Sequence, residues 1–211
     1  MLIPAILAKS QKEFKSKLEK ILPFSDFIQL DIMDGKFVPN KTWGNPKALA
    51  DLSAVIDFEV HLMVENPEKA IEKWAKAGAE RIVFHFEATD NPEKCIEKIK
   101  AGSPRFGRVE AGIAINPETP VLKIKPFIKK IDYVLVMGVT PGFSGQKFQS
   151  KVLAKIKAIR KLAPKIKIGV DGGVGPENAK KIKNAGAKYL CAASGIFNSE
   201  NTAKAIKDLK I

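Results

Sequence analysis

The sequence predicts a single barrel of eight parallel strands surrounded by helices, a (β/α)₈ barrel, across residues 1–211. Eight short runs of β-branched and aliphatic residues recur along the chain, and longer segments with helical periodicity separate them. No low-complexity linker or change of composition marks a second domain. This alternation favours parallel pairing with right-handed crossovers. Eight units favour closure into a barrel, with an open doubly wound sheet as the alternative.

The expected strands follow one another at regular intervals. They span residues 2–7, 27–32, 58–63, 81–86, 111–115, 133–137, 166–170 and 189–193. Amphipathic helices are expected at 67–77, 92–100, 149–162 and 176–185, several of them opened by a proline, which suits the first turn. The phrases Lys-Ala-Gly-Ala at 76–79 and Asn-Ala-Gly-Ala at 184–187 each indicate a helix end, a left-handed glycine cap and a new strand.

The composition narrows the class of protein and of partner. A hydrophobic fraction of 45% with 28% charged residues is typical of globular proteins, and no run of eighteen apolar residues predicts a membrane span. The net charge of +13 suits an anionic partner, but the lysines are spread over solvent-facing helix positions, so a phosphorylated metabolite is favoured over nucleic acid. No basic leader precedes the first apolar run, and Cys95 and Cys191 lack CxxC spacing. We therefore expect a reducing, cytoplasmic setting without disulfides.

Polar residues gather where the expected strands end. They are Gln29, Asp31, His61, His85, Glu87, Asn116, Asp171 and Ser194. In a barrel these ends and the following loops form the active face, while inward positions are normally apolar. Unpaired acids and imidazoles there are costly, so a metal, a substrate or a mutual hydrogen-bond network must satisfy them. Asp31, His61 and Asp171 together predict a functional site.

Glycine-rich segments follow the last three expected strands. They are Thr-Pro-Gly-Phe-Ser-Gly-Gln at 140–146, Asp-Gly-Gly-Val-Gly-Pro at 171–176 and Ala-Ser-Gly at 193–195. Glycine lets the backbone approach an anion closely, and each loop leads into a helix whose free N–H groups favour phosphate. Neighbouring loops of this kind late in a barrel predict a phosphate site.

The chain resembles the ribulose-phosphate 3-epimerase family over nearly its whole length. The matching motifs are Leu-Asp-Ile-Met-Asp-Gly-Lys-Phe-Val-Pro-Asn at 30–40, Val-His-Leu-Met-Val-Glu at 60–65, His-Phe-Glu-Ala at 85–88, Asn-Pro-Glu-Thr-Pro at 116–120, Met-Gly-Val-Thr-Pro-Gly-Phe-Ser-Gly-Gln-Lys-Phe at 137–148 and Val-Asp-Gly-Gly-Val-Gly-Pro at 170–176. The resemblance implies a TIM barrel of the ribulose-phosphate-binding type. It also implies an isomerase that interconverts ribulose 5-phosphate and xylulose 5-phosphate by inverting C3.

The resemblance assigns roles to individual residues. Asp31 and Asp171 match the acid/base pair that moves protons through an enediolate, and Asp31, His61 and Asp171 match ligands of a divalent metal ion (Zn, Mn, Fe or Mg). A methionine layer beside the intermediate matches Met33, Met63 and Met137. The phosphate-binding positions match Gly142, Ser144, Gly145, Gly172, Gly173, Ala193 and Ser194.

Four positions in the expected site depart from the family pattern, two at the metal and substrate positions and two in the phosphate loops. Gln29 stands where the family has a metal-binding histidine, and Ala5 stands where it has a serine expected to contact substrate. A glutamine carbonyl is a weaker ligand than imidazole for zinc or iron and suits harder ions such as magnesium or manganese. Ser144 and Ala193, which replace usual glycines, leave backbone N–H groups available.

Three functions fit these residues. They are an epimerase with an altered metal site, a related isomerase or lyase acting on another sugar phosphate such as a hexulose phosphate, and a non-catalytic phosphosugar-binding barrel. The partner expected in each case is a small phosphorylated sugar, with neither nucleic acid nor membrane. Barrels of this size often form homo-oligomers, and no residue stripe specifies an interface.

Overall fold

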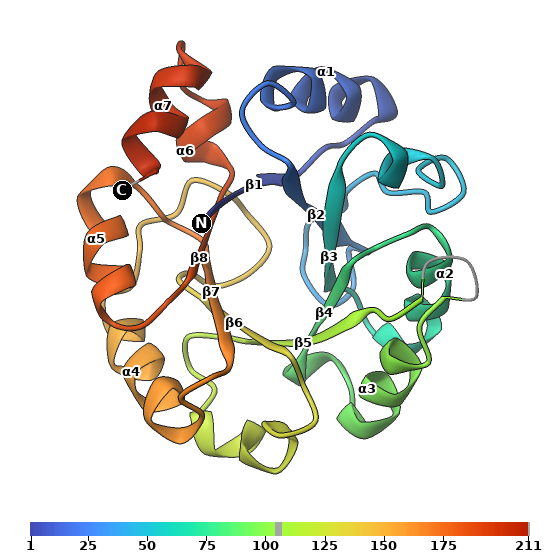
Figure 1. Cartoon of the computed structure of the whole chain (residues 1–211), viewed down its shortest axis with the longest axis vertical. Helices are drawn as coiled ribbons and strands as arrows, with labels where there is room; N and C mark the ends of the chain where they lie inside the picture. Colours follow the sequence, from blue (N-terminus) through green and yellow to red (C-terminus); the bar gives the residue numbers. More distant parts are fainter. Residues whose placement is uncertain (104–106, 211) are drawn as a thin grey trace.

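Eight parallel strands close into a barrel in the computed structural model, in which residues 1–103 and 107–210 are described (Figure 1). The strands are β1 (Leu2–Ile6), β2 (Phe27–Met33), β3 (Asp57–Met63), β4 (Arg81–His85), β5 (Glu110–Ile115), β6 (Tyr133–Met137), β7 (Lys167–Asp171) and β8 (Tyr189–Ala192). Each strand pairs with the next, and β8 pairs back onto β1. This closing pair confirms the barrel and excludes the open sheet.

Helices surround the barrel in Figure 1. The α-helices are α1 (Gln11–Ile21), α2 (Ile71–Lys76), α3 (Pro92–Lys100), α4 (Val152–Leu162), α5 (Pro176–Asn184), α6 (Ser194–Phe197) and α7 (Thr202–Leu209). The described residues also form the 3₁₀ segments η1 (Leu52–Ala54), η2 (Pro67–Lys69), η3 (Phe86–Ala88) and η4 (Val121–Phe127). No helix in 1–103 or 107–210 combines the length and apolar character needed to cross a membrane.

The expected elements agree with the structure except at several ends and in one helix. The prediction of one helix over 67–77 is wrong: a 3₁₀ turn covers Pro67–Lys69, and α2 begins only at Ile71. The left-handed Asn66 and the proline after it start a tight turn before the α-helix begins. The helix expected from 149 begins at Val152, since Gln149 donates its N–H to the carbonyl of Gly138. The two glycine caps are confirmed, with φ of 93° at Gly78 and 117° at Gly186.

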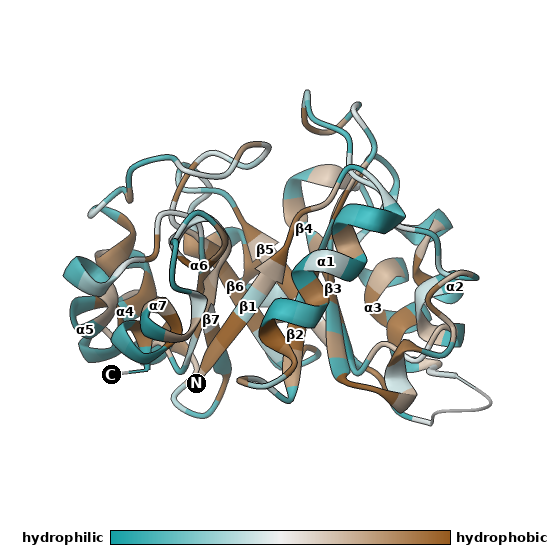
Figure 2. Ribbon diagram, turned by 90° about the horizontal axis from the view of Figure 1, so that it is seen from above, coloured by the Kyte–Doolittle hydropathy of each residue, from teal (hydrophilic) through white to brown (hydrophobic). Residues whose placement is uncertain are grey.

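Alternation along the strands divides the core into two parts. Ile28 and Leu30 of β2 belong to the large apolar cluster that also contains the buried helix residues, whereas Gln29 and Asp31 point the other way, into the barrel. The barrel interior holds a separate apolar cluster of Ile3, Ala5, Val83, Ala114, Tyr133, Leu135, Met137, Tyr189 and Cys191. Figure 2 shows the hydrophobic strands enclosed by helices with hydrophilic outer faces. The inward side chains therefore decide what chemistry the barrel offers.

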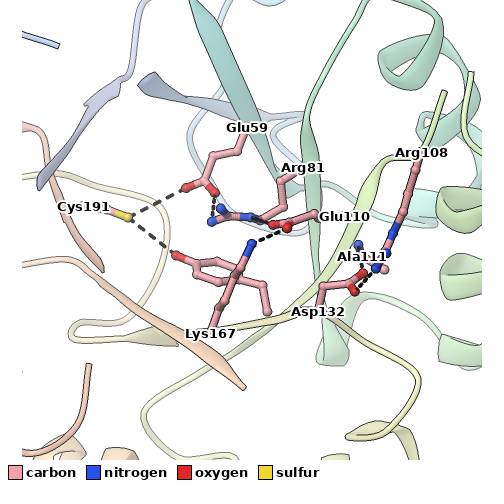
Figure 3. Close-up of polar contacts among 9 residues, drawn as sticks. Glu59, Arg81, Arg108, Glu110, Ala111, Asp132, Lys167 and Cys191 are labelled. Carbon is pink, nitrogen blue, oxygen red and sulfur yellow. Dashed lines mark hydrogen bonds and ion pairs between the residues drawn. The ribbon is translucent and has the colours of Figure 1, made fainter. Parts of the chain in front are cut away.

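A buried ion-pair network occupies the N-terminal end of the barrel interior (Figure 3). Arg81, the first residue of β4, donates to Glu59 at 2.7 Å and to Glu110 at 3.0 Å, and Lys167 pairs with Glu110 as well. The Arg81 guanidinium also lies 4.0 Å from the ring centroid of Tyr133. Burial raises the pKa of Glu59 to about 7, although the charge of Arg81 opposes that shift. This network closes the barrel below the polar residues at the C-terminal strand ends.

Arg81→Met should be strongly destabilising, because Glu59 is fully buried and would lose its cation. We expect the free energy of unfolding in urea to fall by about 3–5 kcal/mol. Lys76→Met breaks a solvent-exposed ion pair of α2 and serves as the control, for which we expect a much smaller loss. Adding Glu59→Gln to Arg81→Met should recover part of the loss. A loss no larger than that of the control would contradict the role of Arg81.

Candidate active site

Asp31, His61 and Asp171 converge inside the C-terminal half of the barrel. They come from β2, β3 and β7, and their ligand atoms all lie within 4.8 Å of one another. The Nδ1 atom of His61 lies 3.2 Å from Asp31 Oδ1 and 3.2 Å from Asp171 Oδ2. The register aligns Asp31 with His61 on adjacent strands, while Asp171 reaches the same point from across the barrel. All three residues are buried.

Gln29 completes this group from beneath. Its Nε2 donates to Asp31 Oδ1 and to Asp171 Oδ2, both at 2.8 Å, so amide and imidazole contact the same two carboxylate oxygens. The other amide atom, Oε1, is buried without a hydrogen-bond partner. Ala5 is the register partner of Gln29 on β1 and carries no hydroxyl that could donate to it. The departures from the family pattern at the metal and substrate positions, Gln29 and Ala5, are thus neighbours on adjacent strands.

Burial and neighbouring groups shift the pKa values of Asp31 and His61. Burial raises the pKa of Asp31, the nearby charge of Asp171 raises it further, and hydrogen bonds with His61 and Gln29 oppose the shift. Burial by itself would lower the pKa of His61, but hydrogen bonds with Asp171 and Asp31 outweigh burial and raise that pKa to about 9. Two buried carboxylates this close together require positive charge beside them.

A cleft that is partly open to solvent lies directly above the two aspartates. All ten residues expected from the sequence to contact the substrate or its phosphate line it, together with Asp31 and Asp171. They are Met33, Met63, Met137, Gly142, Ser144, Gly145, Gly172, Gly173, Ala193 and Ser194. His61 and Gln29 lie beneath the cleft floor and do not line it. Met33 and Met63 end β2 and β3 on one side of the cleft. Met137 ends β6 next to Asp171, on the side formed by the residues after β6, β7 and β8.

The loop after β7 has a backbone that only glycine adopts easily. Gly172 and Gly173 have φ angles of 99° and 66°, and a Cβ on Gly173 would lie 2.6 Å from the backbone nitrogen of Phe148. Glycines of this kind also let the backbone approach a bound anion closely. The loop lies at the cleft rim, at a suitable place for a phosphate group.

The structure connects two further strand-end residues to the site. His85 Nε2 lies 2.9 Å from His61 Nε2, and His85 Nδ1 lies 3.3 Å from Glu87 Oε2. The sequence pattern places His85 and Glu87 on one face at a strand end, but it assigns them no role. Alternation along the strand could have indicated that His85 and Glu87 face the barrel interior. Their contact with His61 is evident only from the three-dimensional structure.

Several cleft residues were not predicted from the sequence. Leu7, Val139 and Pro141 line the cleft, as do Phe143 and Gln146. Gln146 donates its amide N–H groups to the carbonyls of Thr140 and Phe143, which holds the loop after β6 in a compact turn. Trp43, in the long loop after β2, packs against Phe14 of α1 with ring centroids 5.6 Å apart and does not line the cleft.

Comparison with known proteins places these residues in an established family. The profile of the ribulose-phosphate 3-epimerase family matches residues 1–197. A ribulose-phosphate 3-epimerase of Bacillus subtilis is 40% identical over 88% of this chain and 86% of its own length. A cytoplasmic isoform of the enzyme from Oryza sativa is 36% identical over 98% of this chain and 91% of its own length.

Solved structures support the fold alone. The 3-hexulose-6-phosphate synthase of Salmonella typhimurium superposes with a TM-score of 0.73 over 99% of this chain and 95% of its own, at 15% sequence identity. That identity is too low to transfer a substrate. The family profile and the sequence relatives agree on one assignment: the chain belongs to the ribulose-phosphate 3-epimerase family.

Proposed function

We propose that this protein interconverts D-ribulose 5-phosphate and D-xylulose 5-phosphate by inverting the configuration at C3. The observation that carries the proposal is the convergence of Asp31 and Asp171, from strands on different sides of the barrel, at the floor of the cleft. Inversion at a carbon next to a carbonyl needs one group to remove a proton from one face and another to return a proton to the other. Asp31 and Asp171 are the pair available for this.

The two aspartates exchange roles with the direction of reaction. One carboxylate accepts the C3 proton, and the other, protonated, delivers a proton to the opposite face of the enediolate. The apolar side chains of Met33, Met63 and Met137, which line the cleft, exclude water from the reacting carbons and strengthen nearby electrostatic interactions. The phosphate rests against the loop that contains Gly172 and Gly173, which fixes the sugar along the cleft.

Asp31, His61, Asp171 and Gln29 are the residues that would hold a divalent cation. When bound, such an ion supplies electrostatic stabilisation for the charge that develops on the substrate oxygens. The unpartnered Gln29 Oε1 supports this fit, because a half-turn of the amide would exchange Oε1 with Nε2 beside the two carboxylates. Three oxygen ligands and one imidazole favour Mg²⁺ or Mn²⁺ over Zn²⁺.

The other two functions considered have weaker support. The sequence relatives at 36–40% identity are named epimerases, whereas the hexulose-phosphate synthase shares only the fold. A binding protein without chemistry would have no need of two buried carboxylates in contact with one imidazole. A cytoplasmic location is part of the proposal, and homo-oligomerisation stays a prediction from barrel size.

The proposed reaction is tested by incubating the protein with D-ribulose 5-phosphate in deuterium oxide, with Mg²⁺, Mn²⁺, Zn²⁺ or Fe²⁺ added in turn. Xylulose 5-phosphate should form with deuterium at C3, because the returning proton comes from a carboxyl group that exchanges with solvent. Sugar-phosphate binding without any exchange, under every metal, would refute the epimerase proposal and favour a binding protein.

Asp171→Asn should reduce turnover by about 10²–10⁴-fold or more, since an amide neither accepts nor delivers the C3 proton. Binding of ribulose 5-phosphate, measured by calorimetry, should change little, because the glycine loops are untouched. Asp208→Asn, on the exposed side of α7, is the control for loss of one carboxylate and should leave turnover unchanged. Substantial activity of Asp171→Asn would show that the acid/base assignment is wrong.

Gln29→His should shift the metal preference toward zinc. Imidazole is a better zinc ligand than a carboxamide oxygen, so we expect Zn²⁺ affinity to rise by on the order of tenfold, with Mg²⁺ affinity unchanged or lower. Calorimetric titration with each metal measures both. Gln11→His on the exposed start of α1 controls for an added surface histidine. Equal gains from the two substitutions would mean that position 29 is not a ligand position.

A further inference from the structure

We propose that Glu87 and His85 are positioning residues that keep a proton on Nε2 of His61, so that Nδ1 is the atom available to a cation between Asp31 and Asp171. The catalytic consequence rests on the proposed function, whereas the proton arrangement itself does not. The inference comes from an unbroken line of contacts that runs from the loop after β5 to the two aspartates.

The two imidazole rings meet edge to edge. Their Nε2 atoms are 2.9 Å apart, while the ring centroids are 5.0 Å apart with an interplanar angle of 22°. The ring centroids are thus farther apart than the Nε2 atoms, so the two Nε2 atoms point toward each other. The ring planes are close to parallel. Both rings are fully buried. One nitrogen must donate a proton and the other must accept it, because two donors or two lone pairs at this distance repel.

Glu87 decides which of the two donates. The Oε2 atom of Glu87 lies 3.3 Å from His85 Nδ1. An ionised carboxylate can only accept a hydrogen bond. His85 therefore carries its proton on Nδ1, and its Nε2 presents a lone pair. His61 must then donate from Nε2, which leaves Nδ1 directed at Asp31 and Asp171. The opposite tautomer of His85 would place a lone pair against the carboxylate.

Glu87 is held so that only one of its oxygens is free for His85. Its Oε1 accepts from the backbone N–H of Asn116 at 2.9 Å and from the hydroxyl of Thr119. Lys155 of α4 fixes that loop by donating to the carbonyls of Asn116 and Thr119, both at 2.6 Å. Partial burial opposes ionisation, but the hydrogen bonds from His85, Thr119 and Asn116 outweigh it and lower the pKa of Glu87 to about 2.

This arrangement extends a familiar principle by one residue. A histidine that binds a metal usually donates its other N–H to a carboxylate or carbonyl, which fixes the tautomer and the ring orientation. Here the carboxylate acts through a second imidazole. Burial lowers the pKa of His85, although its hydrogen bond with Glu87 opposes that shift. A neutral His85 ring can donate from Nδ1 to Glu87 and accept at Nε2 from His61.

Glu87→Gln should reverse which of the two Nε2 atoms donates, without removing any contact. The glutamine oxygen must take the place of Oε1, because Asn116 and Thr119 both donate there. Its NH₂ group then faces His85 Nδ1, which has to accept. His85 moves its proton to Nε2, so His61 must accept at Nε2. His61 then keeps its proton on Nδ1, between the two carboxylates, where that proton opposes a cation.

Nuclear magnetic resonance of protein with ¹⁵N-labelled histidine rings tests this directly, because His61 and His85 are the chain's two histidines. In the wild-type protein, His85 should be protonated on Nδ1 and not on Nε2, and His61 should be protonated on Nε2. Glu87→Gln should show the reverse at His85. Glu118→Gln, an exposed carboxylate in the same loop, should keep the wild-type pattern. A wild-type His85 protonated on Nε2 would overturn the proposal, whether or not the variant folds.

Calorimetric titration with Zn²⁺ measures the consequence for the cation site. Glu87→Gln should weaken Zn²⁺ binding by about 10–100-fold, and Glu118→Gln should not. If His85 has moved its proton to Nε2 in Glu87→Gln but Zn²⁺ affinity is unchanged, the positioning role is refuted. Neither measurement uses ribulose 5-phosphate. If the protonation pattern and the metal affinities are as expected but the protein has no epimerase activity, the proposed function is refuted and the positioning role of Glu87 and His85 stands.

Discussion

Two buried carboxylates can lie within hydrogen-bonding distance of one imidazole nitrogen only if positive charge or protons stand between them. Asp31 Oδ1 and Asp171 Oδ2 share both His61 Nδ1 at 3.2 Å and Gln29 Nε2 at 2.8 Å. Without those donors the two negative charges would repel in a region of low dielectric constant. These shared hydrogen bonds fix the positions of both carboxylates, which form the polar floor of the cleft above them.

The barrel supplies the rigid frame that this contact needs. The aspartates enter from β2 and β7, and hydrogen bonding to neighbouring strands fixes both backbones. Below them, the network around Arg81 and Glu59 closes the interior, and beside them, His85 and Glu87 connect His61 to the loop held by Lys155. Charge is therefore arranged in two layers, of which the lower stabilises the barrel and the upper faces the substrate cleft.

Much of this layout follows from the sequence because it depends on local rules. Alternation and strand ends predicted that Asp31, His61 and Asp171 would face one interior, and glycine patterns predicted the rim of the cleft. The contact of Gln29 with both aspartates was not predictable, because contacts across a barrel depend on strand tilt and stagger. Arg81 at the start of a strand gave no sign of its burial beside Glu59, and the break between η2 and α2 depends on the left-handed Asn66.

A crystal structure with a divalent cation and a pentitol 5-phosphate, a reduced analogue that cannot react, most directly tests whether the two aspartates flank the reacting carbon. The carboxylates of Asp31 and Asp171 should lie on opposite faces of the carbon equivalent to C3, with the phosphate on the loop of Gly172 and Gly173. Both carboxylates on one face of that carbon, or a phosphate bound away from the glycine loops, would contradict the two-aspartate mechanism.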